Sequence, residues 1–277
     1  MKISESSKFI FIATSQSHIE DRFLYDINYG IGILKNRGVA DENITVIIDL
    51  AIGTWVGKYN NMTKVSIFPS SNLNSLIEST ECDNLFIVSS CHGSLDGIDS
   101  VTPIKPFPLN QALKNNKYAK NILVFLGQCY AGIFNFMDVR DKKKNIVYIG
   151  ATDINASLSY MLNDCGWVAN ISVIALFKWI EKPRDVDGDG VYSITDLYKF
   201  VSYFTNNVTN QIEKIQTAHL IDVSVSLKLE EMRLSTLGSP FMSKIAKDAI
   251  EAIKNYIVPH QNTWILNAIA ASNMQLE

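Results

Sequence analysis

The run Phe9-Ile10-Phe11-Ile12-Ala13 is apolar throughout and has the length of a β-strand. Further short apolar runs follow within the first 150 residues, at 44–48, 85–88, 122–126 and 146–149. A strand that lacks alternating polar residues is covered on both faces, as in a parallel sheet wrapped by helices. These runs predict an α/β protein, a three-layer α/β/α sandwich around a mostly parallel central sheet.

Helical patterns separate these runs. Residues 21–36 place apolar side chains at helical spacing before Gly38, a plausible stop, and residues 109–118 form another such pattern. The second half predicts helices over 166–181 and 194–206, an alternating strand over 221–229 and a long helix that Pro240 opens. We expect one domain over 1–206, and over 207–277 a C-terminal strand and helix extension packed on it.

Composition excludes several classes of protein. Hydrophobic residues make up 47% and charged residues 19%, which is ordinary for a globular chain, and a net charge of −3 predicts neither nucleic-acid nor membrane binding. Neither a signal peptide nor a run of about 20 apolar residues is visible. The four cysteines form no CxxC pair, so we expect reduced thiols and a cytoplasmic location.

Two strand ends carry residues suited to catalysis. Ser90-Cys91-His92-Gly93-Ser94 follows the run at 85–88, and Gly127-Gln128-Cys129-Tyr130-Ala131-Gly132 follows the run at 122–126. Parallel strands expose their carboxyl ends along one edge of the sheet, where ligands bind. We therefore expect His92 and Cys129 to meet above this edge.

This pair of residue types suits nucleophilic catalysis. A thiolate attacks carbonyl carbon, and a nearby imidazole favours the thiolate and protonates the leaving amine. The backbone N–H groups beside Gly93 and Cys129 are candidates for an oxyanion hole. The structural alternative is a buried Cys129 and a hydrogen-bonded His92 without chemistry.

The same motifs resemble the caspase-like (clan CD) cysteine peptidases, and the legumain family most closely. The Cys-His-Gly motif stands 37 residues before Gly-Gln-Cys-Tyr-Ala-Gly, measured from His92 to Cys129. The segment 22–44, from Arg22 through Gly38 to Ile44, is also similar to the legumain segment that holds the first helix. The resemblance covers roughly residues 8–200 and implies a cysteine endopeptidase.

The resemblance also implies a specificity pocket. Arg22 matches an arginine of that pocket, Gln128 and Ser157 match residues around the nucleophile and beyond the next strand, and Asp164 lies near an acidic position. An arginine facing an aspartate suits asparagine, whose amide both accepts and donates hydrogen bonds. Legumains have a glutamate where this chain has Tyr130, and this departure argues against a strict preference for asparagine. The pattern therefore predicts cleavage after Asn or Asp.

A calcium-loop motif follows at 185–196. Asp185, Asp187, Asp189 and Asp196 occupy positions 1, 3, 5 and 12 of the loop, Gly190 occupies position 6, and Val191 offers its carbonyl. The alternative is an acidic turn that caps and connects two helices. The motif predicts a structural Ca²⁺, while the chemistry of the dyad needs no cofactor.

The sequence therefore predicts a cysteine endopeptidase that takes a peptide or protein substrate. Two alternatives keep the fold: a transpeptidase or transamidase, in which an amine replaces water as acceptor at the same dyad, and a catalytically silent, calcium-responsive interaction module.

Overall fold

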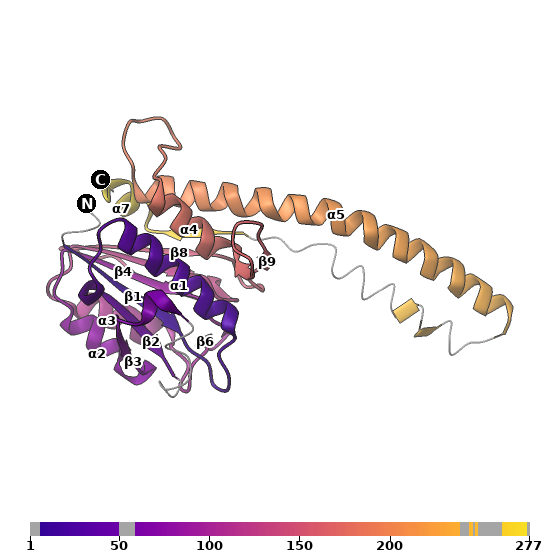
Figure 1. Ribbon diagram of the computed structural model, residues 1–277, viewed down its shortest axis with the longest axis horizontal. Coiled ribbons are helices and arrows are strands. Elements are labelled where there is room, and N and C mark those ends of the chain that lie inside the picture. Colours follow the sequence, from indigo (N-terminus) through magenta and orange to yellow (C-terminus); the bar gives the residue numbers. More distant parts are fainter. Residues whose placement is uncertain (1–5, 50–58, 239–243, 246, 249–261, 276–277) are drawn as a thin grey trace. The chain divides into compact units, whose positions relative to one another are not determined.

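The computed structural model describes residues 6–49, 59–238, 244–245, 247–248 and 262–275. The chain divides into two compact units. The first comprises Met1–Thr205 together with Gln261–Glu277, and the second comprises Asn206–His260. Figure 1 shows the sheet of the first unit with helices on its faces.

A seven-stranded sheet forms the centre of the first unit, in the order β11-β8-β7-β4-β1-β2-β3. All neighbours are parallel except β11, which runs antiparallel to β8. The strands are β1 (Ser7–Ala13), β2 (Ile44–Ile48), β3 (Ser66–Phe68), β4 (Asn84–Ser89), β7 (Asn121–Leu126), β8 (Asn145–Gly150) and β11 (Trp264–Leu266). Two small antiparallel hairpins are β5 (Gly93–Ser94) with β6 (Gly97–Ile98), and β9 (Ser159–Met161) with β10 (Val168–Asn170).

Helices cover both faces of the sheet (Figure 1). α1 (Asp21–Asn36) and α4 (Ile171–Glu181) pack together on one face, and α2 (Leu73–Ser79) and α3 (Pro106–Asn115) on the other. Short 3₁₀ helices are η1 (Asp41–Asn43), η2 (Asn60–Met62), η3 (Ser70–Asn72) and η4 (Ala131–Phe136). The predicted three-layer α/β/α sandwich is confirmed.

Each central strand buries both of its faces. Phe9 and Phe11 of β1 lie in the core beneath α1 and α4, whereas Ile10 and Ile12 lie in the core beneath α2 and α3. Successive side chains of a strand point to opposite faces, so a strand between two helical layers must be apolar throughout. This is the physical reason for the run at residues 9–13.

The helices of the second half differ from the prediction. α5 extends over Ile194–Thr236, so the helix expected to end at residue 206 continues, and the strand expected over 221–229 is wrong. α4 begins at Ile171 rather than at residue 166, because residues 168–170 form β10 and Asn170 caps the helix. The long helix expected from Pro240 lies mostly outside the described residues.

The C-terminal segment returns to the first unit. β11 pairs with the outer edge of β8, and α7 (Ala268–Asn273) follows it. Trp264 Nε1 donates to the carbonyl of Thr152 at 2.8 Å, and Asn267 Nδ2 donates to that of Ile146 at 2.9 Å. The expected extension over 207–277 is therefore divided, since residues from 261 belong to the unit that contains the sheet.

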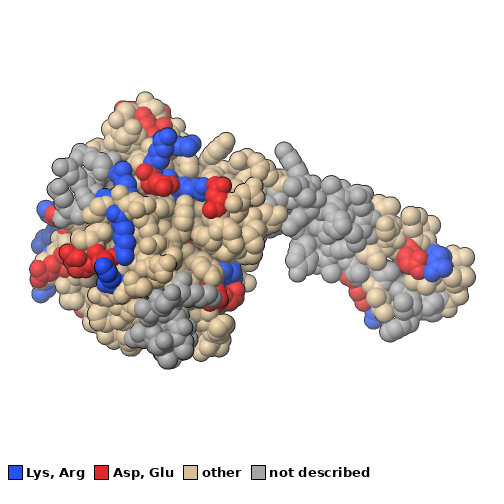
Figure 2. All heavy atoms as spheres, viewed as in Figure 1, with Lys and Arg blue, Asp and Glu red and all other residues tan. Residues whose placement is uncertain are grey.

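Charge is mixed on the surface of the first unit. On the side seen in Figure 2, acidic and basic side chains lie beside one another among the described residues. Within the same residues, no helix combines the length and the apolar character needed to span a membrane.

Candidate active site

The loops that carry His92 and Cys129 leave the sheet side by side. β4 and β7 are parallel neighbours whose last pair is Ser89 with Leu126. His92 and Cys129 each stand three residues beyond that pair. Gly127 donates its N–H to the carbonyl of Ser89 at 3.1 Å, so pairing continues into the loops. Strand register thus places the two loops side by side at the carboxyl edge of the sheet.

Gly93 brings the two loops into direct contact. A Cβ added at Gly93 would lie 2.3 Å from the carbonyl oxygen of Cys129 and 2.5 Å from Cγ of Gln128. Real Cβ atoms do not approach other atoms so closely, so only glycine permits this packing. The residue after His92 therefore touches the backbone of Cys129 itself.

Cys129 lies at a sharp turn. The next residue, Tyr130, has a left-handed φ of 56°, which is uncommon for a side chain of this size. Its N–H donates to the carbonyl of Asn155 at 2.8 Å, and η4 begins directly after it. Sγ of Cys129, which is half-buried, accepts the N–H of Ser157 at 3.3 Å. Backbone held in a sparsely populated region is frequent at functional sites.

His92 has a carboxylate partner that the sequence prediction missed. Nε2 of His92 lies 2.6 Å from Oε1 of Glu20, and both side chains are partly exposed. The ring of Phe23 packs edge-on against the imidazole, with centroids 4.9 Å apart. Glu20 precedes α1 in the loop that follows β1, at the same edge of the sheet. An acidic residue just before the first helix was the available signal.

Glu20 also pairs with Arg22. Its Oε2 accepts from Nε of Arg22 at 2.5 Å. The hydrogen bond from Arg22 is the main cause that lowers the pKa of Glu20, and His92 contributes in the same direction against the effect of burial. The carboxylate is therefore ionised near neutral pH and holds the imidazole from one side.

Two of the predicted pocket residues, Arg22 and Ser157, make contacts near His92 and Cys129. Nη1 of Arg22 donates to Oγ of Ser159 at 2.7 Å, and its Cζ lies 4.2 Å from the centroid of the Phe23 ring. Ser157 approaches Cys129 through its N–H and accepts from Nδ2 of Asn170 at 3.2 Å. Arg22 thus contacts Glu20, the partner of His92, and Ser157 contacts Cys129.

Gln128 and Asp164 are placed differently from the prediction. Gln128 is only 1% exposed and its Oε1 accepts from the hydroxyl of Ser89, so it supports the loop from beneath. The side chain of Asp164 is 73% exposed and pairs with Nζ of Lys178 at 2.8 Å. Asp164 therefore has a lysine of α4 as its partner, and its role in the pocket stays a prediction.

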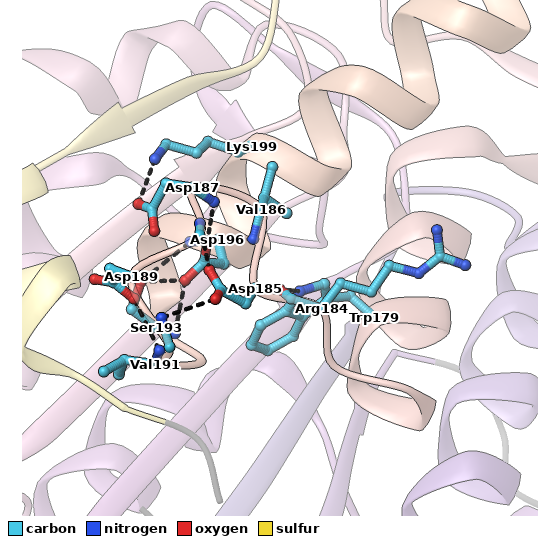
Figure 3. A network of polar contacts seen from close by, with 12 residues as sticks. Trp179, Arg184, Asp185, Val186, Asp187, Asp189, Val191, Ser193, Asp196 and Lys199 are labelled. Atoms are coloured by element: carbon cyan, nitrogen blue, oxygen red, sulfur yellow. Dashed lines mark hydrogen bonds and ion pairs between the residues drawn. The ribbon is translucent and has the colours of Figure 1, made fainter.

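Three aspartates gather in the predicted calcium loop (Figure 3). Asp185, Asp187 and Asp189 each place a carboxylate oxygen within 4.8 Å of the others. Hard oxygens in such a group suit Ca²⁺. A salt bridge of 2.5 Å from Nζ of Lys199 already partly neutralises Asp187.

Asp196 does not join this group. Its Oδ1 accepts from the N–H of Val186 at 2.8 Å, and its Oδ2 from the N–H of Ser193 at 2.9 Å (Figure 3). Burial acts to raise the pKa of Asp196, yet these hydrogen bonds keep it below its ordinary value. Val191 donates its N–H to Asp189 at 2.8 Å, and its role as a carbonyl ligand stays a prediction. Carboxylates from three of the five predicted ligands therefore lie close enough together to hold a cation.

Comparison with known protein families finds no family model that matches the chain, and comparison with curated proteins finds no match. The site must therefore be interpreted from its own geometry. It places a half-buried thiol and an imidazole held by a carboxylate on two loops that touch at Gly93, and these are groups that thiol-based acyl transfer uses.

Proposed function

We propose that this chain is a cysteine endopeptidase of the caspase-like kind, similar to the legumains, with Cys129 as nucleophile and His92 as its proton partner. One observation carries the proposal: the contact of Gly93 with Cys129, which joins the loops at neighbouring strand ends. A cysteine and a histidine that only fill the core would not need their loops to come into such close contact.

The reaction proceeds through a thioester. Sγ of Cys129 attacks the carbonyl carbon, a C–S bond forms, and the carbonyl electron pair moves to oxygen, where the N–H groups of Gly93 and Cys129 hold it. The intermediate then expels the amine, which takes a proton from His92. Water attacks the thioester and gives a proton to His92, and the acid leaves as the thiolate is restored.

Arg22 supports a preference at the residue before the cut. Its guanidinium faces Ser159, and its own carboxylate partner, Glu20, is shared with His92. A positive group that donates several hydrogen bonds favours a substrate side chain that accepts them. We therefore propose cleavage after Asp or Asn, with Asp favoured because Asp164 is engaged by Lys178.

The four cysteines are free, which suits a nucleophilic thiol in a reducing compartment such as the cytoplasm. Asp185, Asp187 and Asp189 would hold a Ca²⁺ ion if one binds. Such an ion would supply no chemistry to the reaction and would only fix the connection between α4 and α5.

The test compares two cysteine variants. Cys129→Ala should lower peptide hydrolysis by at least about a thousandfold and abolish labelling by a thiol-reactive peptide probe. Cys165→Ala is the matched control, since this half-buried thiol lies in the turn between β9 and β10. Equal labelling of the wild type and Cys129→Ala would contradict the assignment. Mass spectrometry of products formed with an added amine separates hydrolysis from transpeptidation.

A further inference from the structure

Asp26 is a buried carboxylate that the reaction above does not use. It lies on α1, four residues after Arg22, and is fully buried. Its Oδ1 accepts from Nε1 of Trp167 at 2.8 Å. Its Oδ2 accepts from Oγ of Ser90 at 2.9 Å and from the N–H of Asn170 at 3.2 Å. Two segments, the start of the loop that bears His92 and residues 167–170, therefore meet at this carboxylate of α1.

One of these segments leads to the thiol. The side-chain oxygen of Asn170 caps α4 by accepting from two backbone N–H groups, while its Nδ2 donates to the carbonyl of Gly127 at 2.6 Å and to Oγ of Ser157 at 3.2 Å. The N–H of Ser157 in turn points at Sγ of Cys129, at 3.3 Å. Asn170 thus holds both the loop that bears Cys129 and the residue that contacts its sulfur.

Another segment leads to the imidazole. Ser90 is fully buried and stands two residues before His92. Its hydroxyl donates to Asp26, and its N–H donates to the carbonyl of Ile12 at 2.9 Å. Ser90 is therefore fixed on both sides, and the start of the His92 loop is fixed with it.

We propose that Asp26 is a positioning residue that holds the His92 loop and the Cys129 loop in one geometry. The inference rests on the proposed function, which names these two residues as the reacting pair. Burying a carboxylate costs free energy unless the group is well hydrogen-bonded. Its three donors lie in the segments that lead to His92 and Cys129, which agrees with a positioning role.

The charged surroundings of Asp26 agree with this role. Burial raises the pKa of its carboxyl to about 7, and the hydrogen bonds from Trp167, Ser90 and Asn170 oppose that rise. Arg22, from the same helix, acts in the same direction as those bonds. Cys165, from the turn between β9 and β10, is the thiol that interacts with Asp26 electrostatically.

The test measures how fast iodoacetamide alkylates Cys129, followed by the mass of the peptide that contains it. Asp26→Asn keeps the size of the side chain but turns one acceptor into a donor, which then faces an N–H or O–H group. We expect the alkylation rate and kcat to fall roughly tenfold, with KM changed by less than about twofold. Trp167→Phe removes one donor more gently and should act in the same direction by a smaller factor.

The matched control is Asn84→Ala, a buried polar site at the opposite end of β4. It should lower the unfolding midpoint and leave alkylation of Cys129 in the folded protein unchanged. Wild-type alkylation in folded Asp26→Asn, or an equal loss in Asn84→Ala, overturns the inference. If the wild type cleaves no peptide but alkylation follows the expected pattern, the peptidase assignment fails and the positioning role stands.

Discussion

Glu20 serves two partners with its two oxygens. One oxygen lies against Nε2 of His92 and the other against Nε of Arg22, at 2.6 and 2.5 Å. A carboxylate against an imidazole fixes the ring and stabilises its protonated form. In the proposed reaction His92 carries a proton between steps, so Glu20 acts as a positioning residue for it.

Glu20→Gln tests this role. The amide keeps the size of the side chain but loses the charge that holds the imidazole, so kcat should fall roughly 10- to 100-fold. Glu42→Gln is the matched control, because Glu42 is exposed in η1 at the opposite edge of the sheet. Steady-state kinetics with one peptide checks both variants, and unchanged kcat in Glu20→Gln would remove Glu20 from the site.

At the scale of elements, five strands of the sheet and the loops that carry His92 and Cys129 followed from the sequence, because burial on both faces leaves an unambiguous apolar run. The short edge strands β3 and β11 did not. The second half did not. Ile221, Val225 and Leu229 alternate with polar residues as a strand does, yet they also stand four apart and fit one face of a helix. No glycine or proline interrupts residues 194–236, so the helix continues through them.

The site was predicted as far as strand register determines it. Cys129 and His92 depend only on which strands are neighbours, and Gly93 marks the close approach. Glu20 was missed because the loop after β1 has no periodicity that reveals which side chain turns toward the edge. The ion pair between Asp164 and Lys178 was also missed, because sequence similarity does not show that the lysine of α4 reaches this aspartate.

The loop over 185–196 makes its own prediction. If Ca²⁺ binds the three aspartates, 10 mM CaCl₂ should raise the unfolding midpoint by a few degrees over EGTA, as expected for ligand in roughly tenfold excess over Kd. Asp189→Asn should abolish the rise, and Asp141→Asn, in an exposed turn, should keep it. Equal midpoints with CaCl₂ and EGTA in the wild type would make the loop an acidic cap only.

At the scale of the whole molecule, Asp26 links stability to pH. Its pKa is raised to about 7 in the folded chain and is near 3.8 otherwise, so the folded state binds the extra proton between these values. Stability contributed by this group is present below about pH 4 and is lost as pH rises toward 7. The loss amounts to roughly 3 to 4 kcal/mol.

Urea unfolding at pH 5 and pH 8 measures this effect. The wild type should lose more free energy of unfolding than Asp26→Asn over that interval, because the amide does not titrate. Carboxyls whose pKa is lowered, such as those of Glu20 and Asp196, titrate below this interval and do not obscure the comparison. An identical loss in both proteins would show that Asp26 does not change its proton occupancy on unfolding.

The strand β11 has a consequence for biosynthesis. It covers the edge of β8, yet more than a hundred residues separate β8 from it along the chain. A ribosome delivers β8 long before residues 264–266, and until then the backbone of Tyr148–Gly150 is an open edge that another nascent chain could pair with. The sheet therefore gains the strand that covers this edge only after residues 264–266 have been synthesised.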